Sequence, residues 1–190
     1  MQQKGLALKM NKVMKEMIST LLYLLAVLCL TYFVITFIGQ RTKVDGASME
    51  STLYDGDNLI VDKITYRFED PQRFDIIVFP FQYQENTYYI KRIIGLPGET
   101  VQIDERGDIY IDGELLVESY GKEVIRAENI GIASEPIKLG NDEYFVMGDN
   151  RNNSTDSRTE VVGNIKRKDI LGRAWLRIWP FSRFEVLKHQ

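Results

Sequence analysis

Histidine and cysteine, which supply many of the nucleophiles, bases and zinc ligands of enzymes, occur only once each in this sequence. Cys29 lies inside a long apolar run, and His189 is the next-to-last residue. Outside that run there is no cysteine for a disulfide, a thiol nucleophile or a zinc site. A single terminal histidine also argues against a Ser-His-Asp triad and a histidine-based metal site. The sequence therefore predicts a protein that works without a metal or another cofactor.

An excess of positive charge is also lacking in the part of the chain that follows the apolar run. Residues 41–190 carry 20 Lys and Arg against 26 Asp and Glu, a net charge of −6. Because proteins that bind nucleic acid normally have a basic surface, we expect no nucleic-acid partner. Low-complexity tracts, blocks of like charge and internal repeats are absent as well. These absences indicate one folded domain rather than a disordered or repetitive chain.

One long stretch of the sequence has no charged residue. From Met17 to Gln40 there is no Asp, Glu, Lys or Arg, and residues 18–38 are predominantly apolar. About 20 apolar residues in a helix span the ~30 Å hydrocarbon layer of a membrane. A cleavable signal sequence would have a shorter apolar core, followed by a small-x-small site. Residues 18–38 are therefore predicted to be a retained, single-pass transmembrane anchor.

The residues before the anchor predict its orientation. Four lysines stand there against one glutamate, and basic flanks stay on the cytoplasmic side of a membrane. We therefore expect residues 1–17 to be cytoplasmic and residues 41–190 to form an extracytoplasmic domain at the cell membrane. The lipid bilayer is then one partner of the chain.

Short runs of valine, isoleucine, tyrosine and phenylalanine, separated by turn residues, follow the anchor. This pattern is typical of hairpins, and Asp112-Gly113 is the clearest two-residue turn. The predicted fold class is mainly β, an antiparallel β-sheet domain preceded by one N-terminal transmembrane helix. Residues 119–142 have the least pattern and are expected to form a small irregular insertion. The predicted strands are Asn58–Ile64, Phe74–Phe79, Thr87–Ile94, Thr100–Ile103, Asp108–Ile111, Tyr144–Met147 and, as the last, Ile170–Trp179.

Without a usable histidine or cysteine, a nucleophile in this domain would be a hydroxyl with another kind of base. A buried lysine can serve, since burial disfavours the ammonium form and lowers its pKa. Lys91 lies in the predicted strand Thr87–Ile94 among apolar residues. Because side chains alternate along a strand, Arg92 should point to the opposite face. By itself, a lysine in such a position is more often a half-exposed strand residue.

Four blocks, in this order behind an apolar segment, resemble those of bacterial type I signal peptidases. They are GASMESTL from Gly46, RFDIIVF from Arg73, YYIKRIIGLPGE from Tyr88 and MGDNRNNSTDSR from Met147. The last block is the most specific, and together they cover most of residues 44–158. The resemblance implies a membrane-anchored serine endopeptidase that removes signal peptides from secretory precursor proteins. It also implies an active site near the secretion translocon.

The resemblance also implies roles for individual residues. Ser48 matches the nucleophile and Lys91 the general base of a Ser-Lys dyad, and Ser154 matches a hydroxyl that positions the lysine amine. The family has charged residues that brace its active site, and they correspond here to Arg92, Asp149, Asp156 and Arg158. We expect Arg92 to pair with Asp149. Apolar positions of the pockets that accept small Ala-x-Ala side chains match Val44, Leu53 and Ile90.

Two positions bear on how far the resemblance extends. Ser51 stands where the family usually has proline, which frees the backbone φ angle and restores an N–H group. Gly46 stands where some members have a hydroxyl that helps to bind the oxyanion, and glycine is found there in many Gram-positive relatives. The oxyanion would then be bound by backbone N–H groups.

Two other functions remain open at this point. A signal-peptidase-like assembly factor would keep the fold without the dyad, whereas Ser48 and Lys91 are both present. A self-cleaving Ser-Lys protease of the SOS-repressor type would share the dyad but has no reason to be anchored. The aromatic C-terminal stretch either touches the membrane, through Phe181 and Phe184, or packs inward, through Trp175 and Trp179.

Overall fold

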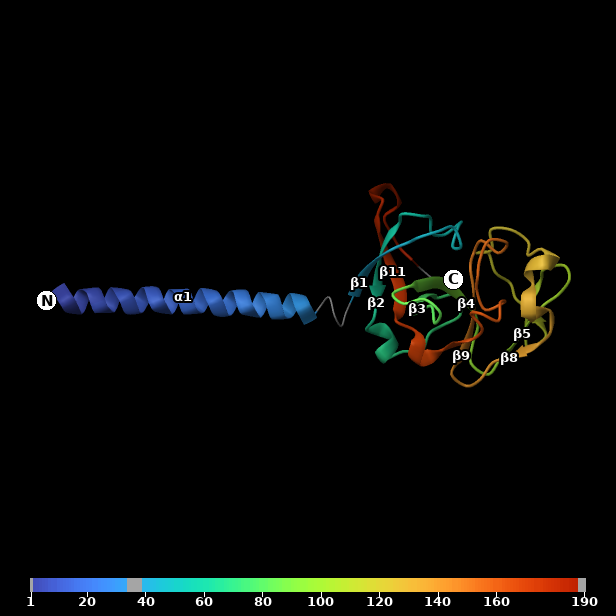
Figure 1. Cartoon of the computed structure of the whole chain (residues 1–190), viewed down its shortest axis with the longest axis horizontal. Coiled ribbons are helices and arrows are strands. Elements are labelled where there is room, and N and C mark those ends of the chain that lie inside the picture. Colours follow the sequence, from blue (N-terminus) through green and yellow to red (C-terminus); the bar gives the residue numbers. More distant parts are fainter. Residues whose placement is uncertain (1, 34–38, 188–190) are drawn as a thin grey trace. The chain divides into compact units, whose positions relative to one another are not determined.

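The computed structural model describes residues 2–33 and 39–187 of the chain. It divides into two compact units, Met1–Gly39 and Gln40–Gln190 (Figure 1). The first unit is the helix α1, Gln2–Phe33, whose residues Lys12–Phe33 are long and apolar enough to cross a membrane. Side chains in this stretch, such as Leu21 and Leu28, are exposed. The predicted end of the anchor, residues 34–38, and His189 lie outside the described residues.

The second unit contains an eight-stranded sheet in which every described pairing is antiparallel. Its order is β1-β2-β11-β3-β4-β9-β10, and β12 pairs with β11. The strands, in chain order, are β1 Gly39–Lys43, β2 Asn58–Asp62, β3 Ile76–Pro80, β4 Tyr88–Gly95, β9 Glu143–Met147, β10 Ile165–Lys166, β11 Gly172–Trp179 and β12 Glu185–Val186. Short 3₁₀ helices join several of them: η2 Thr65–Arg67, η5 Arg167–Asp169 and η6 Phe181–Arg183.

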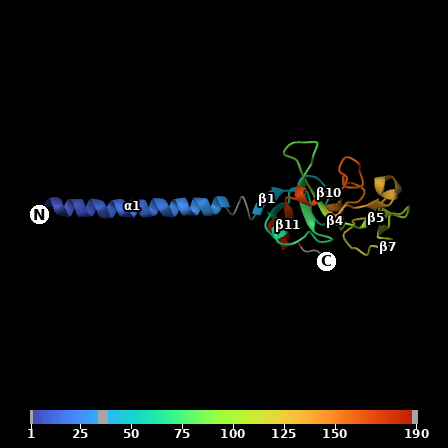
Figure 2. The ribbon, with the colours of Figure 1, turned by 90° about the horizontal axis from the view of Figure 1, so that it is seen from below.

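A second, four-stranded sheet has the order β7-β6-β5-β8. Its strands are β5 Thr100–Ile103, β6 Ile109–Ile111, β7 Glu114–Leu115 and β8 Ile137–Lys138. Ile111 pairs with Glu114 across the Asp112-Gly113 turn, so the predicted hairpin is confirmed. Two views of the ribbon place β5 on one side of β4 and place β1 and β11 on the other (Figures 1 and 2).

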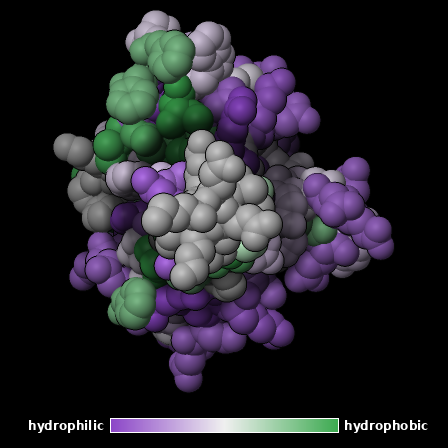
Figure 3. Space-filling model, turned by 90° about the vertical axis from the view of Figure 1, so that its left-hand side faces the viewer, coloured by the Kyte–Doolittle hydropathy of each residue, from purple (hydrophilic) through white to green (hydrophobic). Residues whose placement is uncertain are grey.

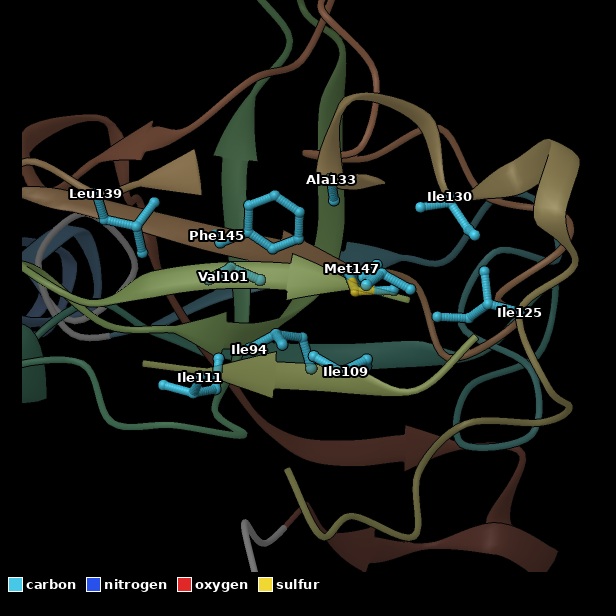
Figure 4. Packing of buried hydrophobic residues seen from close by; sticks show 11 residues of the cluster. Ile94, Val101, Ile109, Ile111, Ile125, Ile130, Ala133, Leu139, Phe145 and Met147 are labelled. Atoms are coloured by element: carbon cyan, nitrogen blue, oxygen red, sulfur yellow. The ribbon is translucent and has the colours of Figure 1, made fainter. Parts of the chain in front are cut away.

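The two sheets enclose a core to which both contribute. Ile94 of β4, Val101 of β5 and Phe145 of β9 belong to one buried cluster, and their side chains gather between the strands in Figure 4. The irregular insertion 119–142 contains η3 Ala127–Asn129, η4 Gly131–Ser134 and β8. Its residues Ile125, Ile130, Ala133 and Leu139 are buried in the same cluster, so the insertion is part of the core.

Most predicted strands are present, but the C-terminal end differs from its prediction. Strand β11 is followed by the two-residue β12, and its register shifts between Ala174 and Leu176 and again between Arg177 and Trp179. These irregularities interrupt the alternation of side chains. Trp175 and Trp179 are therefore 41% and 51% exposed, which excludes the alternative in which both pack inward. Phe181 and Phe184 are also exposed, and Figure 3 shows hydrophobic side chains gathered on one side of the domain.

A buried carboxylate ties this C-terminal hairpin to the segment that precedes β2. Asp57 is fully buried and accepts hydrogen bonds from Arg177 Nη1 at 3.0 Å and Arg183 Nη2 at 2.8 Å. Arg177 Nη1 also donates to the Thr52 carbonyl at 2.9 Å. A buried guanidinium needs such partners because removing its charge from water costs free energy.

We predict that Asp57→Ala destabilises the domain by about 3–5 kcal/mol, since Arg177 would stay buried without that counterion. Thermal and urea unfolding of the full chain in detergent, followed by tryptophan fluorescence, measures the loss. The matched control is Asp45→Ala, because Asp45 is exposed. Equal stability of the two variants would contradict this account of the ion network.

Candidate active site

Ser48 lies in a helical turn that follows β1. The Met49 carbonyl accepts hydrogen bonds from Thr52 N at 2.9 Å and Leu53 N at 2.8 Å. The side chains of Met49 and Leu53 are fully buried, and this burial fixes the turn on the domain. Ser48 itself is only partly buried, so its hydroxyl stays accessible from a cavity.

Lys91 comes from the middle of β4, where it pairs with Ile77 of β3. Its Nζ lies 2.9 Å from Ser48 Oγ and donates to the Ile90 carbonyl at 3.0 Å. The ring of Tyr89 lies beside the amine, with its centroid 4.8 Å from Nζ. The hydroxyl and the amine of the predicted dyad are therefore in direct contact.

Lys91 is only 4% exposed. Burial lowers its pKa from 10.5 to about 8, because the ammonium loses its hydration when it is enclosed. The carboxylates of Asp156 and Asp149 oppose this effect, while the charge of Arg158 adds to it. The result is an amine that is partly neutral near physiological pH and can accept a proton.

Arg92 points away from Lys91, as the alternation of the strand predicts. Its Nε and Nη2 bind the two oxygens of Asp149 at 2.8 and 2.7 Å, and both residues are fully buried. Thr52 Oγ1 donates to Asp149 Oδ2 at 2.6 Å, and Arg92 also donates to the Phe74 carbonyl. The predicted Arg92–Asp149 ion pair is confirmed, and it joins β4 to the Ser48 turn and to the loop after β9.

The loop after β9 packs directly on the Ser48 turn. Asn150 N donates to the Ser48 carbonyl and Asn150 Nδ2 to the Ala47 carbonyl, both at 3.1 Å. Gly148 permits this approach, since a Cβ there would lie 2.4 Å from the Ser48 carbonyl oxygen and 2.3 Å from Ser154 Oγ. A larger residue at this position would push the two segments apart.

Asp156 and Arg158 form a second buried ion pair in the same loop. Arg158 Nε and Nη2 bind the two Asp156 oxygens at 2.8 Å. Burial alone would raise the pKa of Asp156, but Arg158 and the backbone N–H of Gly148 outweigh it, so this pKa is lowered. The carboxylate therefore stays ionised, and its charge acts on Lys91.

Ser154 is near the dyad, but the expected hydrogen bond to Lys91 is not formed. Ser154 Oγ is enclosed and interacts with the Asp156 carboxylate, whose pKa it helps to lower, although no hydrogen bond of standard geometry is formed among the described residues. The Lys91 amine instead uses the Ile90 carbonyl of its own strand. Ser154 does line the same cavity as Ser48 and Lys91.

A cavity of about 320 Å³ opens beside Ser48 and Lys91. Val44 and Ile90 line it, as the resemblance implies. Leu53 is not among the described residues that line the cavity. It ends the helical turn and packs into the buried cluster that contains Leu59 and Ile76. The remaining lining residues come from segments 43–49, 88–91 and 153–155.

The structure shows the surroundings of Gly46 and Ser51, the two residues that depart from the pattern of the resembling family. Gly46 has a φ angle of 91°, in the region that residues with a side chain rarely adopt. A hydroxyl-bearing residue at this position would therefore strain the backbone. Ser51 is exposed on the outer side of the turn.

No cluster of three or more His, Cys, Asp or Glu residues that could hold a metal occurs in the described part of the chain.

Sequence reasoning missed two residues that hold the site together. Thr52 and Asn150 both lie inside the blocks that carry the resemblance, yet neither was singled out. Each makes a side-chain hydrogen bond to a different segment, Thr52 to Asp149 and Asn150 to Ala47. The only signal in the sequence is their position within those blocks.

Known proteins similar to this chain are peptidases. A family described as "Signal peptidase, peptidase S26" matches residues 15–179. Probable signal peptidase I-2 of Synechocystis sp. is 40% identical over 80% of this chain and 68% of its own length. Signal peptidase I of Leptolyngbya laminosa is 41% identical over 80% and 74%. Signal peptidase I P of Bacillus subtilis subsp. natto is 36% identical over 87% and 90%.

These matches span most of the chain, including the Ser48 turn, β4 and the loop after β9. The chain therefore belongs to the peptidase S26 family and is a type I signal peptidase, a serine endopeptidase that processes signal peptides.

Proposed function

We propose that Ser48 and neutral Lys91 perform the cleavage as a Ser-Lys dyad. The observation that carries this proposal is the 2.9 Å contact between Nζ and Oγ, together with the burial of the amine. Lys91 takes the proton of Ser48 Oγ as the oxygen attacks the scissile carbonyl carbon. The C–N bond then breaks, and the ammonium returns its proton to the leaving amine.

The acyl-enzyme is hydrolysed by the same groups in a second step. Neutral Lys91 takes a proton from water, and the hydroxide attacks the ester carbonyl. Breaking the ester bond releases the signal peptide, and the proton returns to Ser48 Oγ. In each step the backbone N–H of Ser48 donates to the oxyanion. A hydroxyl at position 46 is not needed in this scheme.

We further propose that the precursor binds as an extended strand in the 320 Å³ cavity. The cavity is lined from two sides, by residues 43–49 and by residues 88–91. Hydrogen bonds to the peptide backbone would tolerate varied sequences. Val44 and Ile90 would narrow the cavity and select small side chains before the cut, the Ala-x-Ala preference. Asp149, Asp156, Arg92 and Arg158 brace the site through their ion pairs, and Ser154 orients the amine once the substrate is bound.

The apolar helix anchors the enzyme to the cell membrane in this proposal. Residues 12–33 carry exposed apolar side chains that water would not stabilise. The basic residues at its start place the N-terminus in the cytoplasm. The β domain then lies outside, where precursors emerge from the translocon with their cleavage segments exposed.

The dyad predicts that Ser48→Ala and Lys91→Ala each reduce precursor cleavage by at least about a thousandfold, since nucleophile and base act as one unit. Cleavage of a purified secretory precursor by the full chain in detergent measures this. Unfolding temperature and circular dichroism serve as controls for the fold. Normal processing by either folded variant would refute the dyad.

Cleavage should also depend on pH through Lys91. The amine accepts a proton only when neutral, and burial lowers its pKa to about 8. The value of kcat/KM should therefore rise with pH with a midpoint near 8, well below the midpoint near 10.4 of an exposed lysine, and level off only above that midpoint. A profile that is flat between pH 5 and pH 9 would indicate a different base.

The exposed C-terminal aromatics predict a contact with lipid, because aromatic side chains favour the bilayer interface. Phe181 and Phe184 are 75% and 57% exposed. In a form that starts at Gly39, the double substitution Phe181→Ser and Phe184→Ser should weaken binding to lipid vesicles by about tenfold or more. The matched control is Phe68→Ser, since Phe68 is also highly exposed. Unchanged vesicle binding by the double variant would exclude this contact.

A further inference from the structure

A short segment at the start of the insertion, Glu118–Lys122, lies outside every described helix and strand. Its alternate residues each contact a different part of the active site. Glu118 pairs with Arg151 of the loop after β9 at 2.7 Å, and Lys122 pairs with Glu50 of the Ser48 turn at 2.8 Å. Between them, Tyr120 covers Arg92 of β4. One five-residue segment thus bridges all three segments that build the site.

The central contact of this segment is the ring of Tyr120. Its centroid lies 3.6 Å from Arg92 Cζ, the distance of a guanidinium stacked on an aromatic face. On another side the ring packs against Phe74, with centroids 5.3 Å apart. Arg92 has no exposed surface. Tyr120 therefore forms part of the wall that keeps water away from the Arg92–Asp149 ion pair.

The backbone of the segment is fixed as well. Lys122 N donates to the Asp149 carbonyl at 2.8 Å, and Glu118 Oε2 accepts from Tyr120 N at 3.1 Å and from Gly121 N at 3.3 Å. Glu118 therefore closes a turn with one carboxylate oxygen and binds Arg151 with the other. The Lys122–Glu50 pair is partly exposed, and such pairs contribute little. The ring of Tyr120 and the largely buried Glu118–Arg151 pair are the principal contacts.

The effect of this segment on the reaction follows from its position. Lys91 and Arg92 are neighbours on β4, so a shift of Arg92 that moves the β4 backbone would also move the Lys91 amine. A buried ion pair is held rigidly only while water is excluded. A misplacement of about 1 Å between reacting groups can reduce the rate by roughly a hundredfold.

We propose that Glu118–Lys122 is a positioning strap, with Tyr120 as its central residue. It fixes the Ser48 turn, β4 and the loop after β9 in their positions relative to one another. This inference deepens the proposed function and rests on the Ser48–Lys91 dyad. Tyr120 does not touch the reacting atoms and acts through Arg92. The strap predicts that the loss of the ring affects the chemical step more than the binding of the precursor.

The test uses the full chain in detergent and a purified secretory precursor, at a temperature below the unfolding midpoint of every variant. Tyr120→Ala should reduce kcat by roughly tenfold to a hundredfold and change KM by less than about threefold. Tyr120→Phe should restore kcat, because it keeps the ring. Tyr110→Ala is the matched control, since Tyr110 also contacts an arginine, Arg106, but lies on β6 of the second sheet.

Several outcomes would overturn the strap. The first is a kcat of Tyr120→Ala within about twofold of the wild-type kcat. The second is a kcat of Tyr120→Phe as low as that of Tyr120→Ala. The third is a Tyr110→Ala variant that loses as much kcat as Tyr120→Ala when both have lost the same thermal stability. If Tyr120→Ala does not fold, Tyr120→Leu, which fills the site without stacking, should reduce kcat in the same way. Normal cleavage by Ser48→Ala would refute the dyad itself. An inactive Ser48→Ala together with an unchanged Tyr120→Ala would refute only the strap.

Discussion

The bidentate ion pair between Arg92 and Asp149 is the interaction on which the rest of the site depends. It is fully buried, and it connects β4 with the loop after β9 and, through Thr52, with the Ser48 turn. Removing one partner of such a pair leaves an uncompensated buried charge, so the loss of either residue should weaken the packing of the three segments on one another. The Ser48 turn gains further support from Asp57 and Arg177, which connect it to the C-terminal hairpin.

The alternation of side chains on β4 explains how one strand can carry both an ion-paired arginine and a lysine with a lowered pKa. Arg92 binds a buried carboxylate, whereas Lys91 faces the cavity beside a hydroxyl and an aromatic ring. Burial favours the neutral form of Lys91, and among the described residues its hydrogen-bond partners are a hydroxyl and a backbone carbonyl rather than a carboxylate. The carboxylates of Asp149 and Asp156 lie close enough to limit this effect, which leaves the pKa at about 8.

Much of this arrangement could be predicted from the sequence, because it depends on local rules. Alternation placed Lys91 and Arg92 on opposite faces, and the Asp112-Gly113 turn defined its hairpin. What could not be predicted depends on contacts between distant segments. The register shifts in β11 expose Trp175 and Trp179. The helical turn that follows Ser48 places Leu53 in a buried cluster. Tyr120 stacks on Arg92 from a segment whose sequence has no periodic pattern. Ser154 lies beside the dyad, but the Lys91 amine takes a backbone carbonyl as its second partner.

The central claim is that the Lys91 amine loses its proton near physiological pH because it is buried beside Ser48. The most direct measurement is an NMR titration of the Lys91 side chain in the full-length Ser48→Ala variant, which is expected to cleave nothing. Chain-wide labelling of the lysine side chains, with Lys91→Met to assign the signal, isolates this residue. The account predicts a pKa near 8 for Lys91, while the exposed lysines titrate near 10.4. A Lys91 pKa of 10 or above would contradict it.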